Sequence, residues 1–161
     1  EAMEAGALLF NDLQNYPLRA RIMYAATCAL NGMTVPGKKS QDWGVHAIGH
    51  CLSVVYDLAH GASLTIAYPA WMKHQLHQNA GDRISLLGKA LFNTIDKSET
   101  ITAFESFFRK LGCPVRLSEA GIYLDDSKSD HLLEVMQNNQ VSGLAYPIDH
   151  KDLPGIIQWM K

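Results

Sequence analysis

The chain has 161 residues, of which 47% are hydrophobic and 19% charged, and its formal net charge is −2 at pH 7. This composition is typical of one globular domain with a real core and excludes an intrinsically disordered chain. The small charge, with basic residues scattered along the sequence, argues against nucleic acid or an anionic membrane as a partner.

The first part of the chain predicts two helices joined by a short turn. Apolar residues recur at three- and four-residue steps over residues 2–14, which indicates a helix buried along one stripe. Asn15 and Pro17 mark the start of a second helix that ends at Leu30. An exposed loop follows at residues 35–40. The inner face predicted for the second helix consists of Ile22, Met23, Ala26 and Ala29 or Leu30.

Helical patterns continue through the rest of the chain, and no segment has a strand-like period of convincing length. Pro69 is expected to end or kink its helix, and the phenylalanines near residue 105 are expected in the core. The fold class is therefore all-α, with many helices. The predicted helices begin near Asp42, cover about residues 61–78, 84–91 and 98–111, follow a cap at 125–127, and end with residues 151–160.

Three histidines in the middle of the chain have a spacing that could allow them to bind a metal ion or a substrate. His46 and His50 lie one turn apart on the same helix face, so one ion or substrate could touch both. On an unbroken helix His60 would lie about 21 Å beyond His46, so the chain must turn back if both hold one ion. The His60-Gly61 pair is a plausible break.

Known histidine motifs do not settle what this cluster does. Ala47 stands where a zinc peptidase motif requires glutamate, and the single Asp57-x-x-His60 sequence falls short of the repeated Glu-x-x-His pairs of a di-iron bundle. The spacing alone leaves open both a metal role and an ordinary polar or capping role.

The residues around the histidines carry a family resemblance. The motifs are Asp42-Trp43-x-x-His46-x-x-x-His50, Tyr56-Asp57-Leu58-x-His60-Gly61 and Pro69-x-Trp71-Met72, with Tyr16-Pro17-x-Arg19-Ala20, Ala25-Ala26-Thr27-x-Ala29-Leu30-Asn31-Gly32 and Phe107-Phe108-x-x-Leu111-Gly112-x-Pro114 on either side. Together they resemble the iron-containing alcohol dehydrogenases over nearly the whole chain. The branch most alike is that of the butanol dehydrogenases and NADPH-dependent aldehyde reductases.

The resemblance implies a ligand set for one divalent metal, Fe(II) or Zn(II). In this family an aspartate and three histidines hold the ion, and two of those histidines match His46 and His60. The other two ligands form an Asp-x-x-x-His pair that we expect before Glu1. His50 matches a histidine beside the substrate, where it orients substrate, relays a proton or makes a structural hydrogen bond.

The resemblance also implies how the enzyme is divided. Residues 1–161 would be its C-terminal, all-helical metal-binding domain, and an N-terminal α/β domain outside this chain would bind NAD(H) or NADP(H). No glycine here lies in the strand-to-helix turn that dinucleotides require. The expected activity is the interconversion of small alcohols and aldehydes by hydride transfer in a homodimer, with no turnover by the chain alone.

Two other functions stay open. One is a non-catalytic helical module for binding or dimerisation, derived from the same family. The other is a related glycerol or lactaldehyde reductase. The sequence before Glu1 would distinguish the first from the enzyme, because a glycine-rich loop and an Asp-x-x-x-His pair belong only to the enzyme.

The remaining polar residues have simpler interpretations. We interpret Asp42 as an N-cap or helix-start carboxylate, and Asp57 as a helix cap or an orienting partner of a ligand histidine. Cys51 is interpreted as a small buried residue, with a nucleophile as the alternative. The three cysteines lie far apart, and no apolar run suits a membrane helix, so we expect a cytoplasmic protein with reduced thiols. Histidines expected at the solvated surface are His74, His77 and His131.

Overall fold

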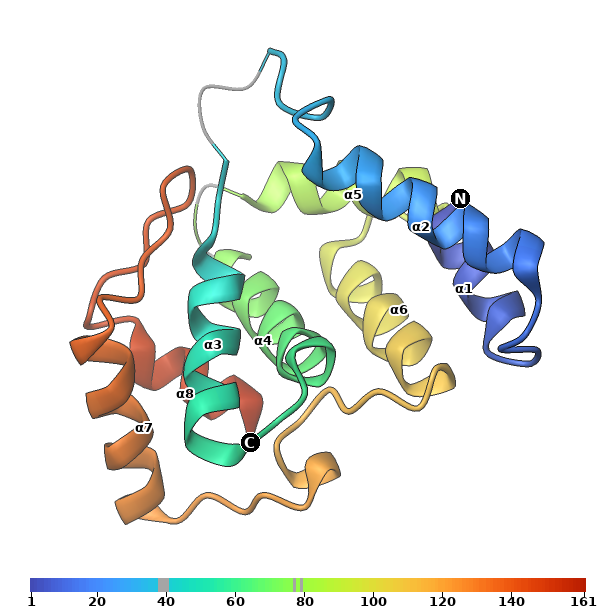
Figure 1. Ribbon diagram of the computed structural model, residues 1–161. Helices are drawn as coiled ribbons and strands as arrows, with labels where there is room; N and C mark the ends of the chain where they lie inside the picture. Colours follow the sequence, from blue (N-terminus) through green and yellow to red (C-terminus); the bar gives the residue numbers. More distant parts are fainter. Residues whose placement is uncertain (38–40, 77, 79) are drawn as a thin grey trace. The chain divides into compact units, whose positions relative to one another are not determined.

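The protein is described by a computed structural model that covers residues 1–37, 41–76, 78 and 80–161. Over these residues the secondary structure is entirely helical, which confirms the all-α fold class (Figure 1). The chain divides into two compact units, Glu1–Gln41 and Asp42–Lys161. In the described part of the chain, no helix combines the length and the apolar character needed to cross a bilayer.

The first unit contains α1 (Ala2–Leu9) and α2 (Tyr16–Leu30), which pack against each other. The Asn15 side chain accepts a hydrogen bond of 3.1 Å from the backbone N–H of Leu18, which confirms the predicted start of α2. The Arg21 guanidinium donates to the Glu1 carboxylate at 2.6 and 3.0 Å, and this ion pair joins the two helices.

Two expectations for this unit are wrong. The first helix ends at Leu9 rather than at residue 14, because Asn11 and Asp12 close the chain in tight turns after it. The predicted inner face of α2 is largely open, since α2 has no buried residue and the Met23 side chain is 70% exposed. Within this unit α1 is the helix that packs against α2. One short helix cannot cover the whole apolar face predicted for α2.

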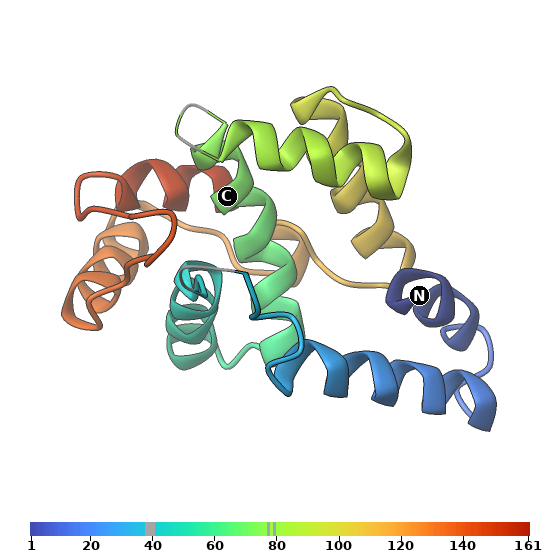
Figure 2. The ribbon, with the colours of Figure 1, turned by 90° about the horizontal axis from the view of Figure 1, so that it is seen from above.

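The second unit is built around α4 (His60–Gln75). Figures 1 and 2 show α4 between α3 (Gly44–Tyr56) and α6 (Lys97–Lys110), and it also packs against α8 (Leu153–Met160). Pro69 was expected to end or kink its helix, and the structure excludes the first of these effects, because Pro69 lies inside α4. The helix continues because the residues around Pro69 are buried, and their packing outweighs the loss of one backbone hydrogen bond.

The other helices agree with the sequence to within a few residues. Asp96 and Asp125 cap their helices by accepting from the backbone N–H groups of Glu99 and Lys128, at 2.7 and 2.8 Å. Phe104 of α6 is buried, as expected for the aromatic stripe, whereas Phe107 and Phe108 are only partly buried. These helices are α5 (Gly81–Phe92), α6, α7 (Asp126–Asn138) and α8, and the sequence did not predict the short 3₁₀ turn η1 (Ser118–Ala120).

A buried ion cluster fastens α6 to α4 and to the segment before η1. The Glu105 side chain is 10% exposed and accepts from Lys73 Nζ at 2.7 Å and from Arg116 Nη1 at 3.0 Å. Burial alone would raise the pKa of Glu105, but these hydrogen bonds and the charges of Lys73 and Arg116 lower it below its ordinary value. The carboxylate therefore stays charged within the unit.

The cysteines behave as structural thiols. All three are free, and Cys51 is only 2% exposed inside α3, which agrees with its interpretation as a small buried residue. Burial raises the pKa of the Cys51 thiol, so the reactive thiolate is disfavoured.

Candidate metal and substrate site

The chain turns back between α3 and α4 over only three residues. Helix α3 ends at Tyr56, and Asp57 follows in the left-handed conformation with φ 53°. Aspartate tolerates this conformation better than most residues and here acts as the backbone cap of the helix. The predicted break at His60-Gly61 is therefore three residues late, because both residues lie in the first turn of α4.

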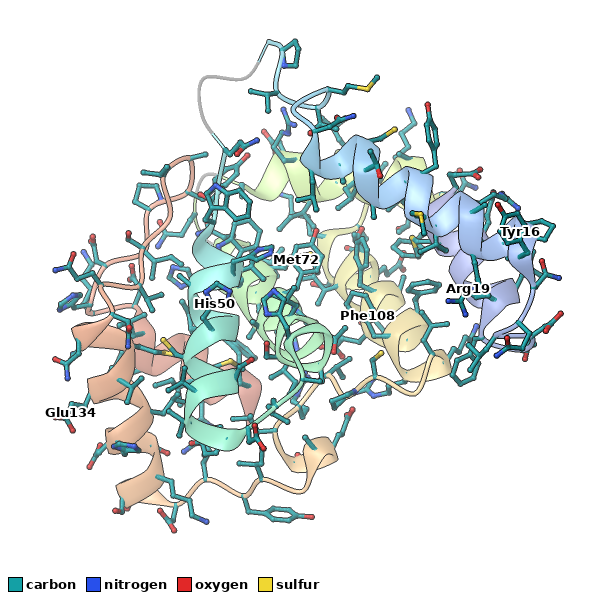
Figure 3. All side chains as sticks on the ribbon, in the orientation of Figure 1. Tyr16, Arg19, His50, Met72, Phe108 and Glu134 are labelled. Atoms are coloured by element: carbon teal, nitrogen blue, oxygen red, sulfur yellow. The ribbon has the colours of Figure 1, made fainter. Side chains whose placement is uncertain are left out.

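This turn brings the three histidines of the motif together. The ring centres of His46 and His60 are 5.3 Å apart, those of His50 and His60 are 5.0 Å apart, and those of His46 and His50 are 6.2 Å apart. Figure 3 shows His50 on α3, where its side chain is exposed. The sequence prediction that His46 and His60 meet despite their separation along the chain is consistent with this geometry.

A close crossing of α3 and α4 supports this arrangement. Gly49 is buried in α3, and a β-carbon at this position would lie 2.9 Å from a methyl group of Leu64 and 3.1 Å from the hydroxyl oxygen of Ser63. A side chain at this position would require Leu64 and Ser63 to shift, so glycine favours the close crossing of the two helices. The hydroxyl groups of Ser53 and Ser63 also hydrogen bond across the crossing at 3.1 Å.

The ring spacing fits part of a metal site. A ligand nitrogen lies about 2.1 Å from Zn(II) and its ring centre about 1.1 Å beyond, so two rings of a tetrahedral site have centres about 5 Å apart. His60 satisfies this spacing with either His46 or His50. Among the described residues, no group of three or more His, Cys, Asp or Glu side chains could hold an ion. A metal here would need ligands from outside the chain.

The surroundings of His46 favour its neutral form. Burial, and then the charges that His60 and His50 would carry when protonated, lower the pKa of His46. The Trp43 ring meets the His46 ring edge-on, with centres 5.0 Å apart. Neutral imidazole is the form that binds a metal, so this ring is suited to a ligand role at neutral pH.

A largely apolar hollow of about 520 Å³ opens beside His46. Its size suits a small organic molecule, and such sites commonly combine apolar walls with a few polar groups. Phe108 on α6 is one of its walls, and Figure 3 labels this side chain. Other lining residues include Val45, Leu64, Tyr68, Trp71 and Tyr146. Tyr146 was not predicted as a lining residue, because no local sequence pattern indicates that residue 146 lies near α3.

Asp42 connects Tyr146 to α3, the helix that carries His46 and His50. Its Oδ1 accepts from the Gly44 N–H at 2.9 Å, which confirms a helix-start carboxylate, although the N-cap position itself is Trp43. Its Oδ2 accepts from the N–H groups of Ala145 and Tyr146 at 3.0 and 2.9 Å. The carboxylate therefore joins the start of α3 to two backbone groups that lie 103 and 104 residues further along the chain.

The predictions of surface exposure for the other histidines are confirmed only in part. His131 is exposed, as expected. His74 is not solvated, because its side chain is 13% exposed and its Nε2 lies 3.8 Å from Asp152 Oδ2. The segment before α8 folds back onto α4 there, a long-range contact that helix periodicity does not reveal. The expectation for His77 lies outside the described residues.

The comparison with protein families identifies the family to which the motifs belong. The model for the C-terminal part of the Fe-containing alcohol dehydrogenase family matches residues 3–152. The chain belongs to the iron-containing alcohol dehydrogenase family. Its all-helical fold is thus that of the C-terminal region of this family, as the sequence motifs indicated.

Relatives within the family agree with the predicted branch. The chain is 33% identical to the probable NADH-dependent butanol dehydrogenase 1 of Bacillus subtilis, over 97% of this chain and 41% of that protein. It is 32% identical to the NADPH-dependent aldehyde reductase YqhD of Escherichia coli, over 89% and 38%. The NADH-dependent butanol dehydrogenase A of Thermotoga maritima superposes with a TM-score of 0.87 at 29% identity, over 98% and 42%. The chain spans about two fifths of the length of these relatives.

Proposed function

We propose that this chain is the helical, metal-binding half of an NAD(P)-dependent alcohol dehydrogenase. The observation that supports this most directly is the meeting of His46 and His60, whose ring centres lie 5.3 Å apart although they belong to different helices. The reaction follows from the relatives, which are named as butanol dehydrogenases and an aldehyde reductase. It is the interconversion of small alcohols and aldehydes.

His46 and His60 are the two metal ligands that we assign to this chain. An aspartate and a histidine from the nucleotide-binding half would complete the set. Imidazole and carboxylate ligands suit Fe(II) or Zn(II). The chemistry that a bound ion supplies is Lewis-acid polarisation of the carbonyl oxygen.

We assign the transfer of the substrate's hydroxyl proton to His50. Alcohol oxidation removes a hydride from the carbinol carbon and a proton from the hydroxyl group, and the hydride goes to NAD⁺ or NADP⁺ held by the other half. An imidazole can accept and release the proton. The His50 ring suits this role because it is exposed to solvent and lies 5.0 Å from the His60 ring, beside the proposed ligand pair.

The apolar hollow beside His46 is assigned to the carbon chain of the substrate. Its walls offer few polar partners, since the Thr65 hydroxyl already donates to the Pro114 carbonyl at 2.7 Å and the Asp42 carboxylate already accepts three N–H groups. Such walls favour an alkyl chain over a polyol, because hydroxyl groups buried there would lose their hydrogen bonds to water.

The test uses the protein purified with its upstream, nucleotide-binding half. Elemental analysis measures bound metal, and the loss of NADH or NADPH absorbance with butanal measures turnover. We expect bound iron or zinc and turnover with at least one of the two cofactors, and no turnover by residues 1–161 alone. Bound metal without any turnover would favour the non-catalytic module, and turnover by residues 1–161 alone would contradict the division of roles.

A further inference from the structure

The loop around Tyr146 forms one wall of the hollow beside His46, and it is fastened there by one carboxylate. We propose that Asp42 is a positioning residue that fixes this loop, and that the Tyr146 ring thereby limits the length of alkyl chain that the hollow accepts. This inference rests on the proposed function and deepens it by naming the residues that limit the chain length of the substrate.

The fastening uses both oxygens of the Asp42 carboxylate. Asp42 accepts from Gly44 at 2.9 Å, from Ala145 at 3.0 Å and from Tyr146 at 2.9 Å. Backbone N–H groups that donate to a charged carboxylate form stronger hydrogen bonds than neutral pairs do. The position of Tyr146 is therefore tied to the start of α3, the helix that carries His46.

Gly143 makes this close approach possible. A β-carbon at Gly143 would lie 2.8 Å from Asp42 Oδ2 and would collide with the carbonyl group of Tyr146. A β-carbon at Gly44 would lie 3.1 Å from Asp42 Oδ1. The carboxylate thus lies between two glycines, and the loop is tightly closed around it.

Tyr146 takes part in an aromatic partition. Its ring meets Trp71 edge-on with centres 5.6 Å apart, and Trp71 stacks on Tyr68 with centres 6.2 Å apart. These three side chains border the hollow beside His46 and also a second hollow of about 520 Å³ on α4 and α5. Apolar residues that line only the second hollow include Met72, Ile84 and Leu87.

The aromatic partition limits the length of the alkyl chain that the hollow beside His46 can accept. An alkyl chain that starts beside His46 reaches the rings of Trp71 and Tyr146 before it can enter the second hollow. Removing the Tyr146 ring should join the two spaces, so that longer chains gain apolar contact. Burial of each additional methylene group should improve binding by about fourfold.

The test measures chain-length preference in the complete enzyme, with the upstream half present. The quantity is the ratio of kcat/KM for octanal to kcat/KM for butanal, within a series that runs from propanal to octanal. Tyr146→Ala should raise this ratio by about fourfold for each methylene group that enters the second hollow. Tyr146→Phe keeps the ring and should leave the ratio unchanged.

Asp42→Asn tests the fastening itself. An amide keeps one acceptor oxygen and cannot bond all three N–H groups, so the loop should loosen and the ratio should rise by about two- to fourfold. Any loss with butanal should appear in KM rather than in kcat. The control is Asp82→Asn, which removes a fully exposed carboxylate and should not change the ratio.

Three outcomes would overturn the inference: an unchanged ratio in Tyr146→Ala, an equal loss for every aldehyde in Asp42→Asn, or a Tyr146→Phe ratio that matches Tyr146→Ala. Dissociation constants of the matching alcohols, from quenching of tryptophan fluorescence, provide a readout that needs no turnover. If the wild-type enzyme reduced no aldehyde, the proposed function would fail, and the alcohol series would still show whether Tyr146 limits chain length.

Discussion

The two units of the chain bury their apolar residues to very different degrees. In Asp42–Lys161 the side chains of Leu52, Ile66 and Met72 are fully buried, whereas the buried hydrophobic residue described in Glu1–Gln41 is Ala5. Both units have well-formed helices. The difference shows that helix formation in the small unit depends on local signals, while the larger unit has a core that holds the histidines in place.

The largest expected effect concerns the proposed ligands in the larger unit. In the complete enzyme, His46→Ala and His60→Ala should each lose bound metal and lower kcat/KM by at least about a hundredfold, because Lewis-acid activation is lost. His50→Ala should retain the metal and slow turnover by roughly a hundredfold through the lost proton transfer.

Elemental analysis and steady-state kinetics check these variants, with His131→Ala, at an exposed position of α7, as the control. A metal-free His50→Ala protein together with a metal-loaded His60→Ala protein would show that the ligand pair is wrong. The ring spacings make this a fair test, since His60 lies as close to His50 as to His46.

A matched pair of methionines tests the difference in burial. Met72 is 0% exposed and Met23 is 70% exposed. Met72→Ala should lower the free energy of unfolding by about 2–5 kcal/mol, because it leaves a cavity. Met23→Ala should change it by less than about 0.5 kcal/mol. Urea unfolding compares them, and an equal cost at the two positions would mean that the α2 face is covered.

Acid should weaken the larger unit through Glu105. The pKa of this carboxyl is lowered in the folded protein, so its contribution to stability is complete above the ordinary value near 4.5 and is lost as pH falls through the lowered pKa. Glu105→Gln should therefore cost about 1–3 kcal/mol at neutral pH and progressively less in acid. Urea unfolding at several pH values measures this difference.

Glu134→Gln is the matched control, because Glu134 is exposed on α7 (Figure 3). It should leave the pH dependence of unfolding unchanged. A constant difference between wild type and Glu105→Gln across the acid range would contradict the lowered pKa.

The smallest expected effects come from one helix cap in each unit. Asn15→Ala and Asp96→Ala each remove a side chain that caps the first turn, at a cost of about 1 kcal/mol. Hydrogen exchange should become roughly fivefold faster at amides of α2 in the first variant and of α6 in the second. If either change accelerated both helices equally, the two units would open as one.

The sequence predicted what local chemistry determines. Asn15 and Asp125 indicate the starts of their helices because a cap needs only its own N–H neighbours. The motif around His46 and His60 also predicted which rings should meet. These signals lie within short stretches of sequence, so no knowledge of the tertiary packing is needed to read them.

Contacts between distant segments could not be predicted in the same way. His74 is covered by the segment before α8, Pro69 is held inside a helix by its neighbours, and Tyr146 reaches the site through Asp42. The position of the turn at Asp57 was also missed, because the left-handed conformation there falls on a non-glycine residue. Each of these features depends on packing that periodicity does not describe.

The contact at Gly49 makes the distance between two helices part of the coordination chemistry. An added methyl group there would press on the Leu64 and Ser63 side chains of α4, and any widening of the crossing would move the two proposed donor rings apart. Since a ligand that binds only the folded state also stabilises it, tighter metal binding and tighter helix crossing should rise and fall together. The metal affinity measured in a titration would then report how tightly the two helices cross.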